Sequence, residues 1–192
     1  MKFRLKDKLK NNSGLTLIEL LLSTLLITVI VGLVTLTYFN STRAAETTIN
    51  VATSVKDART AMYRITKDIR EIREASGIET ADTNVITFYS NVDSDEEFEK
   101  VHYYLENDGD FYSLLRQVND GNSIVVITHI INDQIFSYVP DFGEDSLVTP
   151  VDISELDSIR SIGINLVIDQ ESTTEGSRTI DLGTSVTLRN KV

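Results

Sequence analysis

The stretch Ser13-Gly14-Leu15-Thr16-Leu17-Ile18-Glu19, with the apolar run that continues to Phe39, decides how this chain is organised. A short basic segment ends at Gly14, an apolar run of membrane length begins at Leu15, and one carboxylate, Glu19, lies near the start of that run. A charged side chain inserted into lipid costs about 2.5–3.5 kcal/mol, so such a residue commonly has a partner and a function. The position of Glu19 therefore indicates a functional residue.

The charge of the chain is divided unevenly. Residues 1–14 carry five basic side chains and one acidic one, a net +4 in a chain whose formal charge is −11, so the remaining residues carry −15. An acidic body of this kind repels nucleic acid, and the sequence has no evident basic, aromatic groove. The chain contains no cysteine, which excludes disulfides, thiolate metal sites and cysteine nucleophiles.

Residues 15–39 are predicted to be a membrane-spanning helix. As a helix this run is about 37 Å long, enough to cross the ~30 Å hydrocarbon core. It is longer than the apolar region of a cleaved secretory signal, and no A-x-A-like site follows it. Thr24, Thr28 and Gly32 recur every four residues, a small-residue stripe that would let another helix approach closely. The alternative is that threonine and glycine are ordinary members of an apolar helix.

The sequence from Ser13 to Leu20 resembles the N-terminal processing motif of type IV prepilins and type II secretion pseudopilins. The resemblance joins a short basic leader, a terminal glycine, an apolar next residue and a glutamate at the fifth place after the glycine. It implies cleavage between Gly14 and Leu15 by a prepilin peptidase on the cytoplasmic side, and N-methylation of Leu15. The chain departs from the family pattern at Leu15, where phenylalanine is usual, and at Leu36, where a proline often lies inside the helix.

The same resemblance implies a partner for Glu19. Cleavage would create a cationic amine on Leu15, and in an assembled filament Glu19 of one subunit would neutralise the terminal amine of a neighbour. Opposite charges about 4 Å apart attract each other strongly where water is excluded. The alternative is a lone glutamate near a helix N-terminus, tolerated by the helix dipole.

Residues 40–76 are expected to continue the helix as an amphipathic segment that ends at Ser76-Gly77, with Gly77 in a left-handed conformation. A coiled-coil dimer is the alternative for its apolar stripe, but we expect packing within the chain because the strands that follow need a cover. The stripe consists of Ala44, Thr48, Val51, Val55, Ala58, Met62, Ile65, Ile69 and Ile72.

Residues 77–192 have the short apolar runs and turn signals of an antiparallel β-rich domain. The turn Asn107-Asp108-Gly109-Asp110 predicts a hairpin, and residues 140–157 and 170–177 indicate loops. The expected strands lie at 85–89, 101–105, 111–118, 124–131, 135–139, 159–168 and 179–189. One long helix packed on an antiparallel sheet is an α+β fold, and this order of elements is similar to the pilin fold. Residues 65–70, 101–105 with 109–116, and 185–190 resemble the late helix, the central hairpin and the last strand of J-type pseudopilins and W-type minor pilins.

The acidic segment 91–99 has oxygen ligands at alternate positions, a pattern that could hold Ca²⁺. Asn91, Asp93 and Asp95 provide them, but the glycine position of an EF-hand holds Glu96 and its bidentate glutamate position holds His102. A solvated acidic turn is the expectation, and we expect no metal site. The histidines His102 and His129 each lie in a strand-like run without a second histidine at ligand spacing.

The expected function is structural. No nucleotide, hydrolase or metalloprotease motif is present, so we expect neither an enzyme nor a cofactor. The resemblance implies a minor subunit of a type IV pilus-like filament, with membrane lipid, prepilin peptidase and other pilin or pseudopilin subunits as partners and an assembly ATPase and platform protein acting indirectly. The basic leader predicts a single-pass cytoplasmic membrane protein with its N-terminus inside and its C-terminal domain outside, later moved into a cell-surface or periplasm-spanning filament. The alternatives are a pseudopilin of a type II secretion or DNA-uptake machine, and an uncleaved anchor that displays a binding domain.

Overall fold

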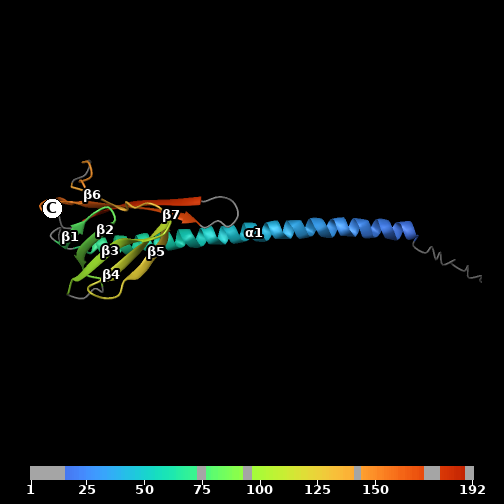
Figure 1. Cartoon of the computed structure of the whole chain (residues 1–192), viewed down its shortest axis with the longest axis horizontal. Coiled ribbons are helices and arrows are strands. Elements are labelled where there is room, and N and C mark those ends of the chain that lie inside the picture. The colour runs from blue at the N-terminus through green and yellow to red at the C-terminus, as the bar shows by residue number, and fades with distance from the viewer. Residues whose placement is uncertain (1–15, 73–76, 93–96, 141–143, 171–177, 189–192) are drawn as a thin grey trace, which may run out of the picture. The chain divides into compact units, whose positions relative to one another are not determined.

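The computed structural model describes residues 16–72, 77–92, 97–140, 144–170 and 178–188. The chain divides into two compact units, Met1–Glu46 and Thr47–Val192. Helix α1 (Leu17–Arg70) begins in the first unit and ends in the second, which also contains every strand of the described residues (Figure 1). The secondary structure is therefore one long helix followed by an antiparallel sheet, and the predicted α+β class is confirmed.

The part of α1 inside the second unit buries one face. The predicted stripe is buried from Ala58 onward, whereas Val51 and Val55 are half-buried and Ala44 and Thr48 are exposed. The buried apolar positions follow one another at spacings of three, four or one, which keeps them on one side of a helix with 3.6 residues per turn. They are Ala58, Ala61, Met62, Ile65, Ile69 and Ile72, and all belong to the core of the domain. Packing within the chain, rather than a coiled coil, therefore covers the stripe from Ala58 onward.

The helix ends earlier than predicted. Its last residue is Arg70, and Ile72 already forms an isolated antiparallel bridge with Ser90. The amide of Ile72 donates to the carbonyl of Ile69 at 3.2 Å, a tight final turn of the 3₁₀ type. Gly77 does not have a positive φ, so the predicted left-handed cap is wrong. The bridge to the sheet ends the helix before the glycine is reached.

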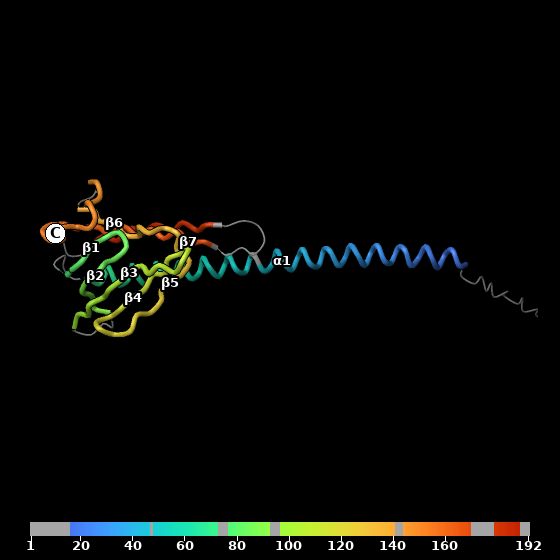
Figure 2. The backbone as a smooth tube through the Cα atoms, viewed as in Figure 1, coloured from blue at the N-terminus to red at the C-terminus, as the bar shows by residue number. Residues whose placement is uncertain are grey.

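The described residues form eight strands in one antiparallel sheet. Strands β1 to β5 are neighbours in sequence order, β7 joins β5 through the pair Ile130–Ile168, and β6 and β8 both pair with β7 (Figure 2). The strands are β1 (Ile78–Ala81), β2 (Val85–Ser90), β3 (Glu99–Asp108), β4 (Phe111–Val118), β5 (Ile124–Ile130), β6 (Phe136–Val139), β7 (Ser161–Gln170) and β8 (Arg178–Thr187). All seven predicted strands have a counterpart here, while β1 was not predicted.

The hairpin between β3 and β4 differs from its prediction in one detail. Asp108 pairs with Phe111, so the two central residues of the turn are Gly109 and Asp110, one position later than in the predicted turn Asn107–Asp110. Gly109 has a φ of 81°, and glycine with positive φ at the first loop position is the requirement of a type II′ turn. The side chain of Asn107 closes the turn, because its Oδ1 accepts a hydrogen bond from the Gly109 amide at 3.0 Å.

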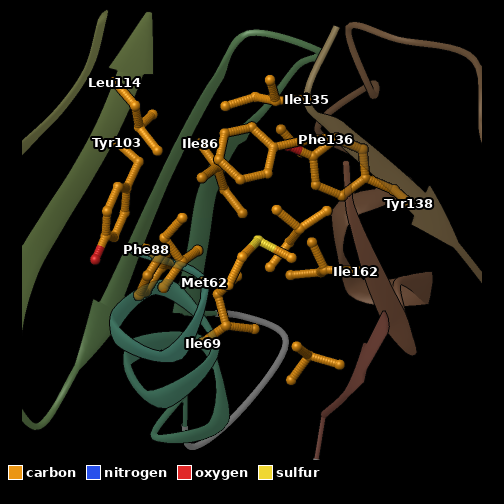
Figure 3. Close-up of a cluster of buried hydrophobic side chains, with 14 of the residues drawn as sticks. Met62, Ile69, Ile86, Phe88, Tyr103, Leu114, Ile135, Phe136, Tyr138 and Ile162 are labelled. Atoms are coloured by element: carbon orange, nitrogen blue, oxygen red, sulfur yellow. The ribbon is translucent and has the colours of Figure 1, made fainter. Parts of the chain in front are cut away.

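The sheet curls around the buried face of the helix (Figure 3). Met62 and Ile69 point from α1 toward side chains of strands on both sides, with Tyr103 and Leu114 on one side and Tyr138 and Ile162 on the other. These side chains are buried, and Phe88 and Tyr103 stack with ring centroids 6.3 Å apart. The apolar faces of the helix and the sheet cover one another, which explains why this unit has its own core.

Candidate functional site

Glu19 takes part in a capping box at the start of α1. The helix begins at Leu17, so Thr16 is its N-cap and Glu19 is the third helical residue. The Glu19 amide donates to Thr16 Oγ1 at 3.3 Å, and the Thr16 amide donates in return to Glu19 Oε2 at 3.4 Å. Two of the amides that a helix leaves without partners at its N-terminus are thereby satisfied. The Thr-x-x-Glu spacing is visible in the sequence, but this role of Glu19 was not predicted.

The capping box occupies only part of the Glu19 carboxylate. Oε2 also accepts a long bond from the Thr16 hydroxyl at 3.5 Å, and the side chain is exposed. Oε1 accepts no hydrogen bond from the described residues. Capping therefore orients the carboxylate without neutralising it, and leaves one oxygen for a further cation.

The helix from Leu17 to Phe39 exposes apolar side chains on every face. Sixteen large apolar side chains in this segment are between 53% and 80% exposed. Burial of one such side chain contributes about 1.5–3 kcal/mol, so contact of the whole segment with water costs on the order of tens of kcal/mol. The segment is long and apolar enough to cross a membrane. This surface therefore requires an apolar environment, which lipid or other helices can provide.

The serine and threonine hydroxyls of the apolar segment are satisfied within the helix. Each donates to a backbone carbonyl three or four residues earlier, an arrangement that removes the cost of a bare hydroxyl in an apolar medium. The bonds are Ser23 to Glu19 at 2.7 Å, Thr24 to Leu21 at 2.9 Å, Thr28 to Thr24 at 2.8 Å, Thr35 to Val31 at 2.8 Å and Thr37 to Leu33 at 2.9 Å. The five hydroxyls therefore do not prevent the segment from lying in lipid.

The small-residue stripe is exposed on the helix. Thr24, Thr28 and Gly32 are all exposed, and a Cβ added at Gly32 would meet no atom within 4 Å. Nothing within the described chain thus requires glycine at this place, and close approach of another helix stays a prediction. Gly14 and Leu15, the predicted cleavage and methylation residues, lie outside the described residues. The structure therefore describes Glu19 and the stripe but not the cleavage site.

A buried charge cluster joins α1 to the β3–β4 hairpin, and the sequence analysis did not find it. Asp68 Oδ2 accepts hydrogen bonds of 2.7 Å from the Tyr103 hydroxyl and from Arg116 Nε. Asp68 and Arg116 are only 4% and 7% exposed, and Tyr103 is fully buried. The Asp68 carbonyl also accepts a bond from Ser90 Oγ at 2.8 Å. Two features of the sequence could have indicated the cluster. One is an aspartate within the apolar stripe, and the other is an arginine two residues after Leu114, on the same inward face of β4.

The protonation states in this cluster follow from its burial. Burial raises the pKa of Tyr103, and the charge of Asp68 raises it further, so the phenol remains a donor. Burial acts to lower the pKa of Arg116, but the hydrogen bond and charge of Asp68 outweigh it and the net pKa is raised. Tyr103 therefore stays a neutral donor, and Arg116 is the cation of an ion pair with Asp68. All three polar groups contact one another in the interior. The cluster therefore suits a structural role, in which it holds α1 against the β3–β4 hairpin, better than a role in binding or transforming another molecule.

The two histidines have separate local partners. His102 Nδ1 lies 2.8 Å from Thr87 Oγ1, and its ring stacks on Tyr104. Burial lowers the pKa of His102, and the charge of Lys100 lowers it further. His129 has a φ of 60°, and its Nδ1 lies 2.9 Å from Thr128 Oγ1.

The acidic segment 91–99 is described only in part. Asp93, Asp95 and Glu96 lie outside the described residues, while the Glu99 carboxylate accepts a bond from the Val92 amide at 2.9 Å. In the part of the chain that the structure describes, no group of three His, Cys, Asp or Glu side chains could hold a metal ion. The Glu99 carboxylate thus binds a backbone amide of its own segment.

The chain was also compared with known proteins. Comparisons with models of protein families, with curated proteins and with solved structures find no match to it.

Proposed function

We propose that this chain is a structural subunit, and a minor one, of a type IV pilus-like filament, assembled through its N-terminal helix. The observation that carries the proposal is the exposed apolar helix surface from Leu17 to Phe39, which contains one carboxylate, Glu19, five residues after Gly14. The resemblance of this stretch to prepilin processing motifs supports the same assignment. So does the helix that covers an antiparallel sheet, because this order of elements is similar to the pilin fold.

In this proposal the apolar segment has two successive environments. Before assembly it lies in the cytoplasmic membrane, with the basic leader inside and the β-rich domain outside. Prepilin peptidase cuts between Gly14 and Leu15, and the new amine on Leu15 is methylated. The helix then leaves lipid for a bundle of helices from other subunits, moved by an ATPase and a platform protein that act on the filament. The unsatisfied Oε1 of Glu19 meets the terminal amine of a neighbour there.

Two related functions use the same segment. A pseudopilin of a type II secretion or DNA-uptake machine would be cut and assembled in the same way. An uncleaved anchor that displays an acidic binding domain would keep residues 1–14. The mass of the mature chain separates the last function from the others. Intact Met1 in membranes that contain active prepilin peptidase would refute cleavage, and with it the proposed function.

The capping box makes a sharper test of Glu19 possible. Glutamine at this position can still cap the Thr16 amide, but it carries no charge. Glu19→Gln should therefore keep membrane insertion and leader cleavage, yet reduce incorporation into filaments about tenfold or more, because the buried amine of the neighbour loses its anion. Incorporation is measured by the amount of the variant in sheared and pelleted filaments.

Thr16→Ala is the matched control. It removes the N-cap hydroxyl, which contributes about 1 kcal/mol to a helix start, and keeps the Glu19 charge. We expect this variant to enter filaments at nearly the wild-type level. If Thr16→Ala fails to assemble while Glu19→Gln assembles normally, the carboxylate serves the helix start and the charge pairing is refuted.

A further inference from the structure

The last strand of the sheet has one open edge. Strand β8 pairs with β7 along its whole length, from Ser161 opposite Thr187 to Gln170 opposite Arg178, and the register has no shift. None of the described residues pairs with the other edge of β8. The strand has ten residues, whereas an average strand has about five or six. A long strand with a free edge is a template for pairing with another extended chain.

The other margins of the sheet are covered or irregular. The edge strands β1 and β6 have four residues each, and both accept hydrogen bonds from the segment after β6. The Val151 amide donates to the Ala81 carbonyl at 2.9 Å, and the Leu147 amide donates to the Tyr138 carbonyl at 2.7 Å. Strand β5 meets β7 at a single pair of residues and has two register shifts against β4. Short length, covering loops and bulges are common protections of a sheet edge, and β8 has none of them.

The side chains of β8 also leave its edge accessible. Residues 179–187 contain no lysine and no proline, the two residues that most often block an edge, and Asp181 is their one charged residue. The side chains at the odd-numbered positions are exposed, and each has at most four heavy atoms. No large or cationic side chain therefore hinders a strand that approaches this edge.

The backbone hydrogen bonds show which amides face the open edge. The Leu188 amide donates to the Arg160 carbonyl at 2.9 Å, and hydrogen-bonded pairs alternate along an antiparallel ladder. Odd-numbered residues of β7 bond on the opposite side, since the Asn165 amide donates to the Ile135 carbonyl at 2.9 Å. The even-numbered residues of β8 therefore bond to β7, and the odd-numbered ones direct their amides and carbonyls to the open edge. We call the latter the edge residues: Thr179, Asp181, Gly183, Ser185 and Thr187.

The two faces of β8 indicate the chemistry of a complementary strand. On the face toward the core Val186 is buried, but Ile180 and Leu182 are only half-buried. Apolar side chains of an added strand would cover the exposed parts of these two residues. On the outer face, Asp181 favours a cation on the neighbouring strand. The partner that fits is an extended segment in which apolar residues alternate with polar ones, including lysine or arginine.

We propose that the open edge of β8 binds an extended segment of a different subunit of the filament, by β-strand addition. The choice of a filament subunit rests on the proposed function, because that function places this domain beside other subunits outside the membrane. One added strand fills the single open edge, so the contact does not repeat between copies of this chain and suits a minor subunit. Main-chain hydrogen bonds provide the affinity, and the alternate side chains of the partner provide the specificity.

Amide hydrogen exchange tests the edge residue by residue. The full chain is studied in a mild detergent, with mass spectrometry that resolves single amides. In the free chain the edge residues should exchange about tenfold or more faster than the even-numbered residues between them, because only the latter bond to β7. Equal protection of the two sets would mean that the edge is already covered, and would overturn the proposal.

The probe for the partner is a synthetic peptide as long as β8, in which valine alternates with threonine and lysine. Its binding should slow the exchange of the edge residues about tenfold or more and leave the amides of α1 unchanged. The same peptide with a central proline is the control, because proline interrupts the ladder, and it should not slow the exchange. Binding that protects other amides but not the edge residues would count against strand addition.

A proline in β8 tests the same edge from the side of the protein. Gly183→Pro removes one edge amide and keeps the bonds to β7, since proline is tolerated where its nitrogen faces away from the ladder. It should lower the affinity for the peptide about tenfold. The matched control is Gly183→Ala, which keeps the amide and whose Cβ meets no atom closer than 3.7 Å; it should bind as the wild type does. Thr179→Pro, near the end of β8, replaces Gly183→Pro if that variant has a lower urea midpoint. Unchanged affinity in the folded proline variant would refute the edge as the binding surface.

The same measurement on sheared filaments separates the contact from the proposed function. Protection of the edge residues in filaments, but not in membranes before assembly, supports the subunit contact. If the chain is cleaved and enters filaments through Glu19 while the edge residues exchange equally in both, only the contact is overturned and the proposed function stands. If Met1 stays intact and the chain never enters filaments, the filament partner is overturned together with the proposed function.

Discussion

Replacement of Asp68 by alanine should strongly destabilise the domain of residues 47–192. Asp68 Oδ2 accepts two hydrogen bonds of 2.7 Å, from the Tyr103 hydroxyl and Arg116 Nε. Arg116 is 7% exposed, so alanine would leave a buried guanidinium without its anion. Removal of one partner from a buried ion pair costs about 3–5 kcal/mol. Domains are stable by about 5–15 kcal/mol, so a large part of the free energy of unfolding would be lost.

The assay is urea denaturation of the full chain in a mild detergent, followed by the near-UV circular dichroism of its tyrosines. With an m-value of about 2 kcal/mol per M, the midpoint should fall by about 1.5–2.5 M urea. The matched control is Glu79→Gln, which removes the ion pair between Lys100 Nζ and Glu79 Oε2, 2.7 Å apart. Both side chains are more than 40% exposed. Solvent screens such a pair, so the control midpoint should barely move.

A midpoint for Asp68→Ala equal to that of the control would refute this reasoning. A second variant identifies the cause of any loss, because Asp68→Leu, Arg116→Met and Tyr103→Phe together remove all three polar groups. Apolar replacement of a buried ion pair is often neutral in its effect on the free energy of unfolding, so this triple variant should recover most of the lost stability. Failure to recover would mean that shape, not the orphaned charge, dominates.

Three further predictions use the same denaturation assay. Gly109 has a φ of 81° in the hairpin turn, so Gly109→Val should cost about 1–2 kcal/mol, and an unchanged midpoint would contradict the turn assignment. A Cβ at Gly163 would overlap Oγ of Ser137 on the neighbouring strand, so Gly163→Ala should destabilise the domain and an added Ser137→Gly should reverse the loss; absence of this rescue would argue against the close approach. Burial and then the charge of Lys100 lower the pKa of His102 in the folded state, so the unfolded chain, with a histidine pKa of about 6.5, binds the proton more readily. The stability contributed by neutral His102 is therefore present above about pH 6.5 and lost as the pH falls through the lower folded pKa, and the fall in midpoint between about pH 7.5 and about pH 5 should be smaller in His102→Gln than in the wild type.

Much of the fold was predictable because it depends on local patterns. The turn signal at residues 107–110 and the apolar run after it predicted β4 at its observed bounds, and the apolar stripe predicted the buried face of α1 from Ala58 to Ile72. Strand β1 was missed because it is short, and its place in the sheet depends on β2. The helix end was misplaced because the bridge from Ile72 to Ser90 competes with further helix. A contact between residues so distant in sequence has no local signal.

The candidate site likewise has features that could be predicted from the sequence and features that could not. The capping box of Thr16 and Glu19 spans three residues and could be read from the Thr-x-x-Glu spacing alone. The pairing of Asp68 with Arg116 could not be read in this way, because 48 residues separate them and many other arginines and carboxylates were available. The outward position of Lys56, Lys67 and Arg70 on α1 likewise depends on which face of the helix the sheet covers.

The sequence by itself determined that residues 15–39 are apolar, that one carboxylate lies near their start, and that a helix precedes a β-rich domain. Composition and periodicity suffice for these features, since burial of apolar surface and backbone hydrogen bonding act on every neighbouring residue. Only the tertiary structure decided that Asp68 is locked to Arg116 and Tyr103, and that the cations of α1 face outward opposite the core. Those features depend on the register of the helix against the sheet, which is set by the fit of many distant side chains together rather than by any one segment.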